Sequence, residues 1–321
     1  MGRHVIVGAG TIGTGLATRL GSAGEEVLVV SRRGVAPAGP GVGAVAADAA
    51  DPAALAALCE GAEVLYNCAN PPYDRWATDW PPLAASLLAA AERSGAVLVT
   101  LSNLYGYGPV DVAMTEELPL AATFSKGRIR AQMWRDAIAA HEAGRVRATE
   151  VRASDYFGPR VTDQGMLGER TVPRILAGKT VTVLGDPDMP HSWTYSDDVT
   201  RALQIVGAQP TAWGHAWHVP SGAAMSARDA IAGLSAAAGV PAPRVRRLPW
   251  AAVRAVGAFA PKVGGLMEVR YQFDRPFVLD SSAFTGAFGV TATPRDTAFD
   301  ETVAWWRDRA AARETASSPA T

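Results

Sequence analysis

The stretch that decides the fold is Val5-Ile6-Val7-Gly8-Ala9-Gly10-Thr11-Ile12-Gly13, an apolar run that turns directly into a glycine-spaced loop. In a dinucleotide-binding βαβ unit, the first glycine permits the tight turn, the second lets the backbone approach a pyrophosphate, and the third lets the helix pack on the sheet. The N–H groups that begin the helix then face the phosphate. A helical run over 15–20 and a strand over 26–30 supply the required context. We therefore assign Gly8, Gly10, Thr11, Ile12 and Gly13 to a dinucleotide site, in preference to a glycine-rich turn of another α/β protein.

The end of the second predicted strand indicates which dinucleotide is bound. An NAD site usually carries an acidic residue about 20 positions after the glycines, where it bonds the ribose 2′-hydroxyl. This chain has Ser31-Arg32-Arg33 instead. A hydroxyl and two guanidinium groups are suited to binding a 2′-phosphate by charge-assisted hydrogen bonds. The alternative is that one or both arginines are solvated surface residues. The three residues favour NADP(H) as the cofactor.

Composition limits the classes of partner. The chain has 321 residues, with 30 Lys/Arg, 31 Asp/Glu and a net charge of −1, so its overall charge predicts no nucleic-acid or membrane partner. The two cysteines, Cys59 and Cys68, have no metal-ligand spacing and are too few for a disulfide framework. No run of 18 apolar residues predicts a transmembrane helix. We expect a cytoplasmic protein without a metal site, acting on a small-molecule substrate.

Strand and helix signals alternate through the first half of the chain, as in a doubly wound parallel sheet. Beyond the first two strands, the apolar runs predict strands over 43–47, 63–67, 96–101 and 147–152 and helices over 52–59, 82–94 and 128–141. The fold class is therefore α/β, a Rossmann doubly wound parallel sheet followed by a smaller C-terminal substrate domain.

The domain division follows from the loss of strand–helix alternation after Asp155, where proline, glycine and tryptophan become frequent. We expect a dinucleotide-binding Rossmann domain over 1–154, with segments near 185–210 and 275–290 returning to it. Residues 155–313 then form mainly the substrate-binding domain. The small and polar residues 314–321 are expected to be a disordered tail.

Four further motifs, in this order and spacing, resemble the extended short-chain dehydrogenases/reductases of the NAD-dependent epimerase/dehydratase family. They are Asp48-Ala49-Ala50-Asp51, Leu104-Tyr105-Gly106, the run from Arg152 to Pro159 that matches Arg…Asn-Val-Tyr-Gly-Pro, and the run from His191 to Val199. The resemblance covers nearly the whole chain and implies that Asp48 contacts the adenine. We assign Asn67 and Ala69, which end the fourth predicted strand, to the cofactor site as well.

The same resemblance suggests where a substrate would bind. Asp155 and His191 occupy substrate-domain positions of the family, and a structural role is the competing interpretation for both. Tyr156 follows Asp155 in the same motif, and Asn70 and Tyr73 lie in the loop after the fourth strand. We predict these five residues to be substrate-binding.

The catalytic signature of the family is replaced at all three positions. The family has Ser or Thr four residues before the tyrosine of Val-Tyr-Gly, where this chain has Leu101. It has Tyr-x-x-x-Lys on the next long helix, with the tyrosine as proton donor and the lysine on the ribose. Here Lys126 takes the tyrosine position and Arg130 the lysine position. The usual hydroxyl relay is therefore not expected.

The replacement residues themselves suggest a proton-transfer site. Residues four apart share one face of a helix, so Lys126 and Arg130 are expected to reach the groove above the cofactor. The pair resembles the Lys-x-x-x-Arg of the atypical, isoflavone-reductase-like branch of the superfamily, whose lysine is the proposed acid/base. An equally weighted alternative is that both cations bind cofactor or face solvent. Tyr105 is the next candidate donor, which gives Lys126, Arg130 and Tyr105 as predicted catalytic residues.

Three functions fit the sequence. The preferred one is an NADP-dependent oxidoreductase that reduces a carbonyl, enone or imine of a small, largely apolar molecule. The second is a redox-neutral epimerase, isomerase or dehydratase that keeps NADP bound. The third is a non-catalytic dinucleotide-binding sensor, because the family triad is absent. A homodimer is left open as the assembly.

Overall fold

A seven-stranded parallel sheet forms the centre of the computed structural model, which describes residues 2–162 and 165–317. The strand order is β10-β6-β5-β4-β1-β2-β3. Because every pairing in this sheet is parallel, the carboxyl ends of all seven strands lie at one edge. The strands are β1 (Arg3–Val7), β2 (Glu26–Ser31), β3 (Val42–Ala46), β4 (Val64–Asn67), β5 (Val97–Asn103), β6 (Arg147–Ala153) and β10 (Ala216–His218).

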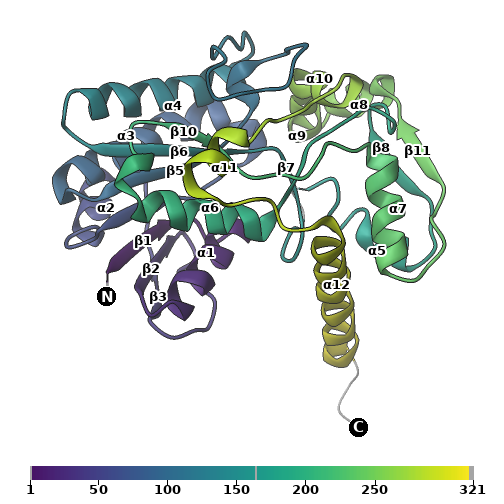
Figure 1. Cartoon of the computed structure of the whole chain (residues 1–321), viewed down its shortest axis with the longest axis horizontal. Coiled ribbons are helices and arrows are strands. Elements are labelled where there is room, and N and C mark those ends of the chain that lie inside the picture. Colours follow the sequence, from purple (N-terminus) through teal and green to yellow (C-terminus); the bar gives the residue numbers. More distant parts are fainter. Residues whose placement is uncertain (1, 163–164, 318–321) are drawn as a thin grey trace.

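Helices cover both faces of this sheet (Figure 1). On one face, α1 and α6 pack against a core that includes Leu16, Val199 and Leu203. On the other face, α2, α3 and α4 enclose a second core that includes Leu55, Trp80 and Leu87. The bounds are α1 (Thr11–Ser22), α2 (Pro52–Leu58), α3 (Trp76–Ser94), α4 (Ser125–Glu142), α6 (Ser196–Ala208) and α11 (Ser282–Phe288). The predicted α/β doubly wound class is confirmed.

A third apolar core lies outside the sheet, at the far end of the molecule from β1–β3 (Figure 1). It gathers Val172, Ile231, Phe299 and neighbouring side chains from helices that flank a two-stranded parallel ladder of β8 and β11. Its elements are α5 (Val172–Leu176), β8 (Val181–Leu184), α7 (Ala227–Ala237), β11 (Val245–Leu248) and α12 (Arg295–Ser317). A further parallel pair, β7 (Asp155–Phe157) and β9 (Trp193–Tyr195), precedes α6.

The remaining elements are short. They are the 3-10 helices η1 (Tyr73–Arg75), η2 (Tyr105–Tyr107), η3 (Pro210–Ala212) and η4 (Gly265–Val269), and the helices α8 (Trp250–Gly257), α9 (Pro261–Gly264) and α10 (Tyr271–Asp274).

Several element boundaries differ from the sequence prediction. Helix α3 begins at Trp76 rather than at residue 82, with Pro81 and Pro82 inside it. These prolines have no N–H to donate to residues 77 and 78, and the burial of Trp76 and Trp80 stabilises the extra turn. Strand β10 extends the return to the sheet beyond the predicted limit at 210. Helix α12 continues to Ser317, past the predicted start of the tail at 314, and residues 318–321 lie outside the described residues.

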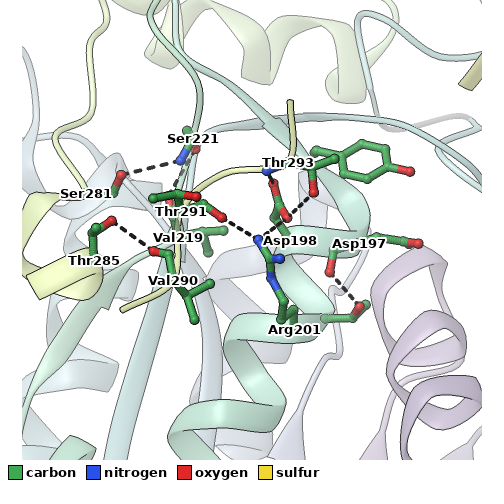
Figure 2. Close-up of polar contacts among 12 residues, drawn as sticks. Asp197, Asp198, Arg201, Val219, Ser221, Ser281, Thr285, Val290, Thr291 and Thr293 are labelled. Carbon is green, nitrogen blue, oxygen red and sulfur yellow. Dashed lines mark hydrogen bonds and ion pairs between the residues drawn. The ribbon is translucent and has the colours of Figure 1, made fainter. Parts of the chain in front are cut away.

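A polar cluster ties the segment before α12 to α6 (Figure 2). The buried carboxylate of Asp198 accepts hydrogen bonds from the Thr293 hydroxyl at 2.7 Å and backbone N–H at 2.9 Å. Arg201 donates both to Asp198 and to the Thr291 carbonyl. Burial raises the pKa of Asp198 above its usual value, and the hydrogen bonds oppose that shift. These contacts fasten the start of the C-terminal helix to the Rossmann domain.

A second polar network is buried beside the edge strand β10. The Nδ1 atom of His218 lies 2.8 Å from the Asp280 carbonyl, which accepts only, so Nδ1 carries the proton. Nε2 therefore accepts from the Tyr107 hydroxyl at 2.7 Å, and Arg152 donates to that hydroxyl at 2.6 Å. Arg152 also pairs with Glu150 at 2.6 Å. The network holds His218 neutral, because burial lowers its pKa to about 4.

This shift predicts a loss of stability in mild acid. The depressed folded-state pKa means that the contribution of His218 is complete above the unfolded value of about 6.5 and is lost as the pH falls towards about 4. The free energy of unfolding should fall by on the order of 3 kcal/mol across this range from His218 alone. Urea unfolding of His218→Asn should show a shallower pH dependence. The exposed His215→Asn control should keep the wild-type slope, and equal slopes in all three proteins would contradict the assignment.

Candidate active site

The glycine loop joins β1 to α1 and leaves room at one position. Gly8 has a φ of 112°, and a Cβ there would lie 2.6 Å from the Cys68 carbonyl oxygen. A Cβ at Gly13 would lie 1.9 Å from the Gly8 carbonyl oxygen, so both glycines are required by the fold itself. A Cβ at Gly10 would meet no heavy atom within 4 Å. Gly10 is also the N-cap of α1 and offers no side-chain acceptor, so the first N–H groups of the helix face this open space.

Four of the other predicted cofactor residues lie at or just after the ends of β2 and β3. Ser31 closes β2, and its hydroxyl accepts a weak hydrogen bond from the Val35 N–H at 3.4 Å. Arg32 and Arg33 are exposed, and neither guanidinium has a hydrogen bond or ion pair with any other residue that the structure describes. Asp48, beyond β3, is exposed and accepts from the Ala50 N–H at 3.0 Å. Two cations and a hydroxyl thus lie at the sheet edge that carries the glycine loop.

The candidate cofactor site also includes the end of β4 and a hydrogen bond from the second half of the chain. Asn67 is buried; its Oδ1 accepts from the Ala69 N–H at 3.3 Å, and its Nδ2 has no partner among residues 2–162 and 165–317. The Thr11 hydroxyl donates to the Arg160 carbonyl at 2.7 Å. The open space at Gly10 and the unpaired amide of Asn67 both fit a bound dinucleotide.

Lys126 lies in the first turn of α4 and is nearly buried. Its Nζ is 3.3 Å from Glu268 Oε1 and 4.5 Å from the centre of the Tyr73 ring. Its backbone N–H donates to Glu268 Oε2 at 3.3 Å. The carboxylate of Glu268, from η4, therefore spans the helix terminus and the ammonium group. This arrangement keeps the ammonium paired beside the Tyr73 ring.

Arg130 occupies different surroundings from Lys126. Its guanidinium carbon lies 4.3 Å and 4.8 Å from the ring centres of Trp80 and Trp76, and it donates to the Leu101 carbonyl at 3.4 Å. Burial lowers its pKa to about 10, so it stays charged near neutral pH. The guanidinium lies against the tryptophans of α3, and its charge also opposes the rise in the pKa values of Tyr105 and Tyr156. That both cations reach a single groove stays a prediction.

The phenol of Tyr73, which lies against Lys126, is next to the phenol of Tyr105. The hydroxyl oxygens of Tyr105 and Tyr73 are 3.5 Å apart. Burial raises the pKa of Tyr105 to about 12, and the Asp155 carboxylate acts in the same direction. Burial also raises the pKa values of Tyr73 and Tyr156 above the usual range. These phenols therefore keep their protons near neutral pH and act as hydrogen-bond donors.

Asp155 begins β7 and His191 lies two residues before β9, so the two side chains face each other at the start of this parallel pair. The Nε2 atom of His191 is 3.0 Å from Asp155 Oδ2, and its Nδ1 is 3.2 Å from the Gln272 carbonyl. The imidazole stacks on Phe273 and Phe277 and is fixed in place. The side chain of Asp155 keeps 26% of its surface exposed. A carboxylate thus stands near the phenol groups, whose pKa values it raises.

The residues that cover this cluster were not predicted from the sequence. Glu268 pairs with Lys126, and Gly265 packs so closely that a Cβ would lie 3.1 Å from Lys126 Nζ and 3.2 Å from the Tyr73 ring. Gln272 supplies the carbonyl that orients His191. The Gly264-Gly265 pair and the isolated acid at 268 were the available signals. Asn70, which was predicted to bind substrate, lies exposed before Tyr73.

The described residues contain no group of three or more His, Cys, Asp or Glu side chains arranged to hold a metal ion. Within the same residues, no helix combines the length and the apolar character needed to span a membrane.

The sequence profile of the NAD-dependent epimerase/dehydratase family matches residues 4–219. This chain belongs to that family. Membership confirms the predicted family relationship. The protein is therefore an enzyme of the short-chain dehydrogenase/reductase superfamily, and its cofactor is a nicotinamide dinucleotide. The match spans the glycine loop and the cluster around Lys126, but it ends before the cover at Gly265–Val269.

One curated relative is the dTDP-6-deoxy-L-talose 4-dehydrogenase (NAD(P)(+)) of Kitasatospora kifunensis, which is 30% identical over 178 residues. The aligned region covers 51% of this chain and 55% of that enzyme, about half the length of each.

Solved structures of other family enzymes share the fold. The dTDP-glucose 4,6-dehydratase of Bacillus anthracis aligns with a TM-score of 0.78 at 16% identity, covering 96% of this chain and 97% of that one. The dTDP-glucose 4,6-dehydratase of Streptomyces venezuelae gives 0.76 at 21% identity and covers 96% and 98%. The UDP-glucuronic acid 4-epimerase of Bacillus cereus gives 0.76 at 16% identity and covers 96% and 99%.

Proposed function

We propose that this family member converts a nucleotide sugar in a redox-neutral reaction, with a tightly held NADP as a transient hydride carrier. The observation that carries the proposal is the pairing of an open dinucleotide cradle at Gly10 with the proton-bearing cluster of Lys126, Tyr105 and Tyr73. The relatives described above are 4-dehydrogenases, 4-epimerases and 4,6-dehydratases of nucleotide sugars. A redox-neutral conversion of a nucleotide sugar fits those relatives better than net reduction of an apolar carbonyl compound.

The cofactor would be held at the shared edge of β1, β2 and β4. The N–H groups at the start of α1 would bind the pyrophosphate, and Ser31, Arg32 and Arg33 would bind the 2′-phosphate. Asp48 would contact the adenine, and the unpaired Asn67 amide would donate to the nicotinamide half. When bound, the dinucleotide would supply reversible hydride transfer at a carbinol carbon of the sugar.

The chain itself would manage the proton of the reacting hydroxyl. Lys126 replaces the family tyrosine, and its ammonium would donate to the developing oxygen or orient it. Tyr105 would extend this donor set through its contact with Tyr73. Asp155 and Tyr156 would bind other sugar hydroxyls, with His191 fixing the Asp155 carboxylate. Arg130, stacked on two tryptophans, would act as a fixed positive charge near the substrate-binding residues.

A second candidate is a net NADPH-dependent reductase. The exposed and unpaired guanidinium groups of Arg32 and Arg33 favour it, because they suit the 2′-phosphate of a cofactor that cells keep mostly reduced. Incubation with dTDP-glucose, UDP-glucose and UDP-glucuronic acid, each with a trace of NADP⁺, separates the two. The redox-neutral proposal expects product in large excess over cofactor. One NADPH formed per sugar oxidised, with conversion limited to the amount of NADP⁺ added, would favour the reductase acting in its reverse direction, and no conversion of any of these sugars would contradict the nucleotide-sugar proposal.

Cofactor selectivity gives a separate prediction. Replacement of both Arg32 and Arg33 by alanine should weaken NADPH binding by one to several decades, since each charge-assisted hydrogen bond contributes about 1.5–3 kcal/mol. NADH binding should change little, because NADH has no 2′-phosphate. A fluorescence titration with both dinucleotides measures this, and Arg93→Ala serves as an exposed, unpaired control. Equal losses for the two dinucleotides would refute the assignment.

A further inference from the structure

A continuous segment next to the active-site cover contains cations but no acid. From Arg244 to Met267 the chain has five Lys/Arg residues and no Asp/Glu, although the whole chain has a net charge of −1. We call residues 244–267 the basic tip; it comprises β11, α8, α9 and the first turn of η4. The side chains of Arg244, Arg246 and Arg254 are exposed and form no ion pair or hydrogen bond with another residue of the described ranges. Their charge is therefore available to an external partner.

The same segment exposes apolar side chains. Phe259 is 92% exposed and Val256 is 54% exposed, and they are two of four large hydrophobic side chains exposed among residues 2–162 and 165–317. The outer face of α8 adds Ala251, Ala252 and Ala255, all exposed. A phenyl ring that projects from a surface of alanines, beside free guanidinium groups, has the chemistry of an interfacial membrane helix.

The basic tip leads directly into the active-site cover. Helices α8, α9 and α10 lie together at the upper right of Figure 1, at the end of the molecule away from β1–β3. Gly257 and Gly264 pack α8 against α9: a Cβ on Gly257 would lie 2.6 Å from the Gly264 Cα. The next residue, Gly265, contacts Lys126 and Tyr73. A surface bound at the tip would therefore lie next to the segment that closes the site.

We propose that the basic tip docks the enzyme on an anionic phospholipid surface. The sign of the charge requires an acidic partner, and a fluid lipid layer accepts a projecting ring without a matching pocket. Each arginine near an anionic leaflet strengthens binding about fivefold, so several cations and one inserted ring give reversible binding. The proposal is independent of which sugar or carbonyl compound the enzyme converts.

Co-sedimentation with vesicles tests the proposal on the full chain. We expect binding to phosphatidylcholine vesicles that contain phosphatidylglycerol, weak binding to phosphatidylcholine alone, and release by salt. Phe259→Ser should lower the partition coefficient about tenfold or more. Arg246→Gln/Arg254→Gln should lower it by about tenfold or more as well. These exposed substitutions leave the fold intact, which a thermal melt of each variant checks.

Matched control variants show whether vesicle binding depends on the basic tip or on any exposed apolar or charged side chain. Val112 is 62% exposed, so Val112→Ser removes an apolar side chain elsewhere. Arg93→Gln/Arg170→Gln removes two exposed cations whose side chains pair with none of the residues that the structure describes. Both controls should bind vesicles like the wild type. Absent wild-type binding, or equal losses in tip and control variants, would overturn the proposal. So would a dimer that dissociates in Phe259→Ser without any vesicle binding, or preferential binding of single-stranded nucleic acid. Dinucleotide binding in the same samples reports on the proposed function separately.

Discussion

A Gly10→Val variant is expected to lose measurable dinucleotide binding while keeping its fold. Gly10 has φ −84° and ψ −169°, a conformation that valine accepts, and a Cβ there meets no protein atom within 4 Å. The branched side chain would instead fill the space through which a pyrophosphate approaches the start of α1. The variant should therefore melt close to the wild-type temperature and show no fluorescence response to NADPH or NADH.

The control for this prediction is Gly222→Val. Gly222 also has open space around its Cβ position and no positive φ, but it lies outside the glycine loop. It should bind dinucleotide normally. Wild-type affinity in Gly10→Val would mean that the loop is not the phosphate site, whereas unfolding of Gly10→Val alone would mean that the space is needed for folding.

The Lys126→Met variant is expected to lower kcat by about 10²–10⁴-fold, the usual contribution of general acid–base catalysis. Methionine keeps the length of the side chain and removes its charge, so packing against Tyr73 is largely preserved. Dinucleotide affinity should change little. The measurement is turnover of whichever of the three nucleotide sugars the wild-type enzyme converts.

Two companion variants make this result specific. Lys126→Met leaves the Glu268 carboxylate without its ion pair, so Lys126→Met/Glu268→Gln should be as slow as the single variant if the lost ammonium is the cause. Arg128→Met changes an exposed cation two residues away on α4 and should keep full turnover. Full turnover by Lys126→Met would transfer the proton role to Tyr105, which Tyr105→Phe then tests.

The sheet was predictable because its central strands are buried on both faces. Runs such as Val64-Leu65-Tyr66-Asn67 and Val97-Leu98-Val99 stand out in the sequence, and the glycine loop fixes which strand comes first. Residues at strand ends, such as Arg32 and Asn67, then fall at one edge without further information. Local patterns were sufficient for the fold and for the candidate cofactor residues.

The surroundings of the two cations were not predictable in this way. Glu268 reaches Lys126 across 142 residues of sequence, and no local pattern connects them. Arg130 stacks on Trp76 and Trp80, in a part of α3 that lies before the predicted start of this helix at residue 82. Helical spacing places Lys126 and Arg130 on one face of α4, but the position of each charged group depends on the residues that contact it in the folded chain.

The most direct test of the account follows one hydrogen atom. dTDP-glucose deuterated at C4 is incubated with the enzyme and bound NADP⁺, and the deuterium is located by mass spectrometry in the sugar product and in the dinucleotide. The account predicts that the enzyme returns the label to the sugar product and that no reduced dinucleotide accumulates. Label retained on released NADPH would show net oxidation, and replacement of the deuterium by hydrogen from the solvent would exclude the hydride chemistry altogether.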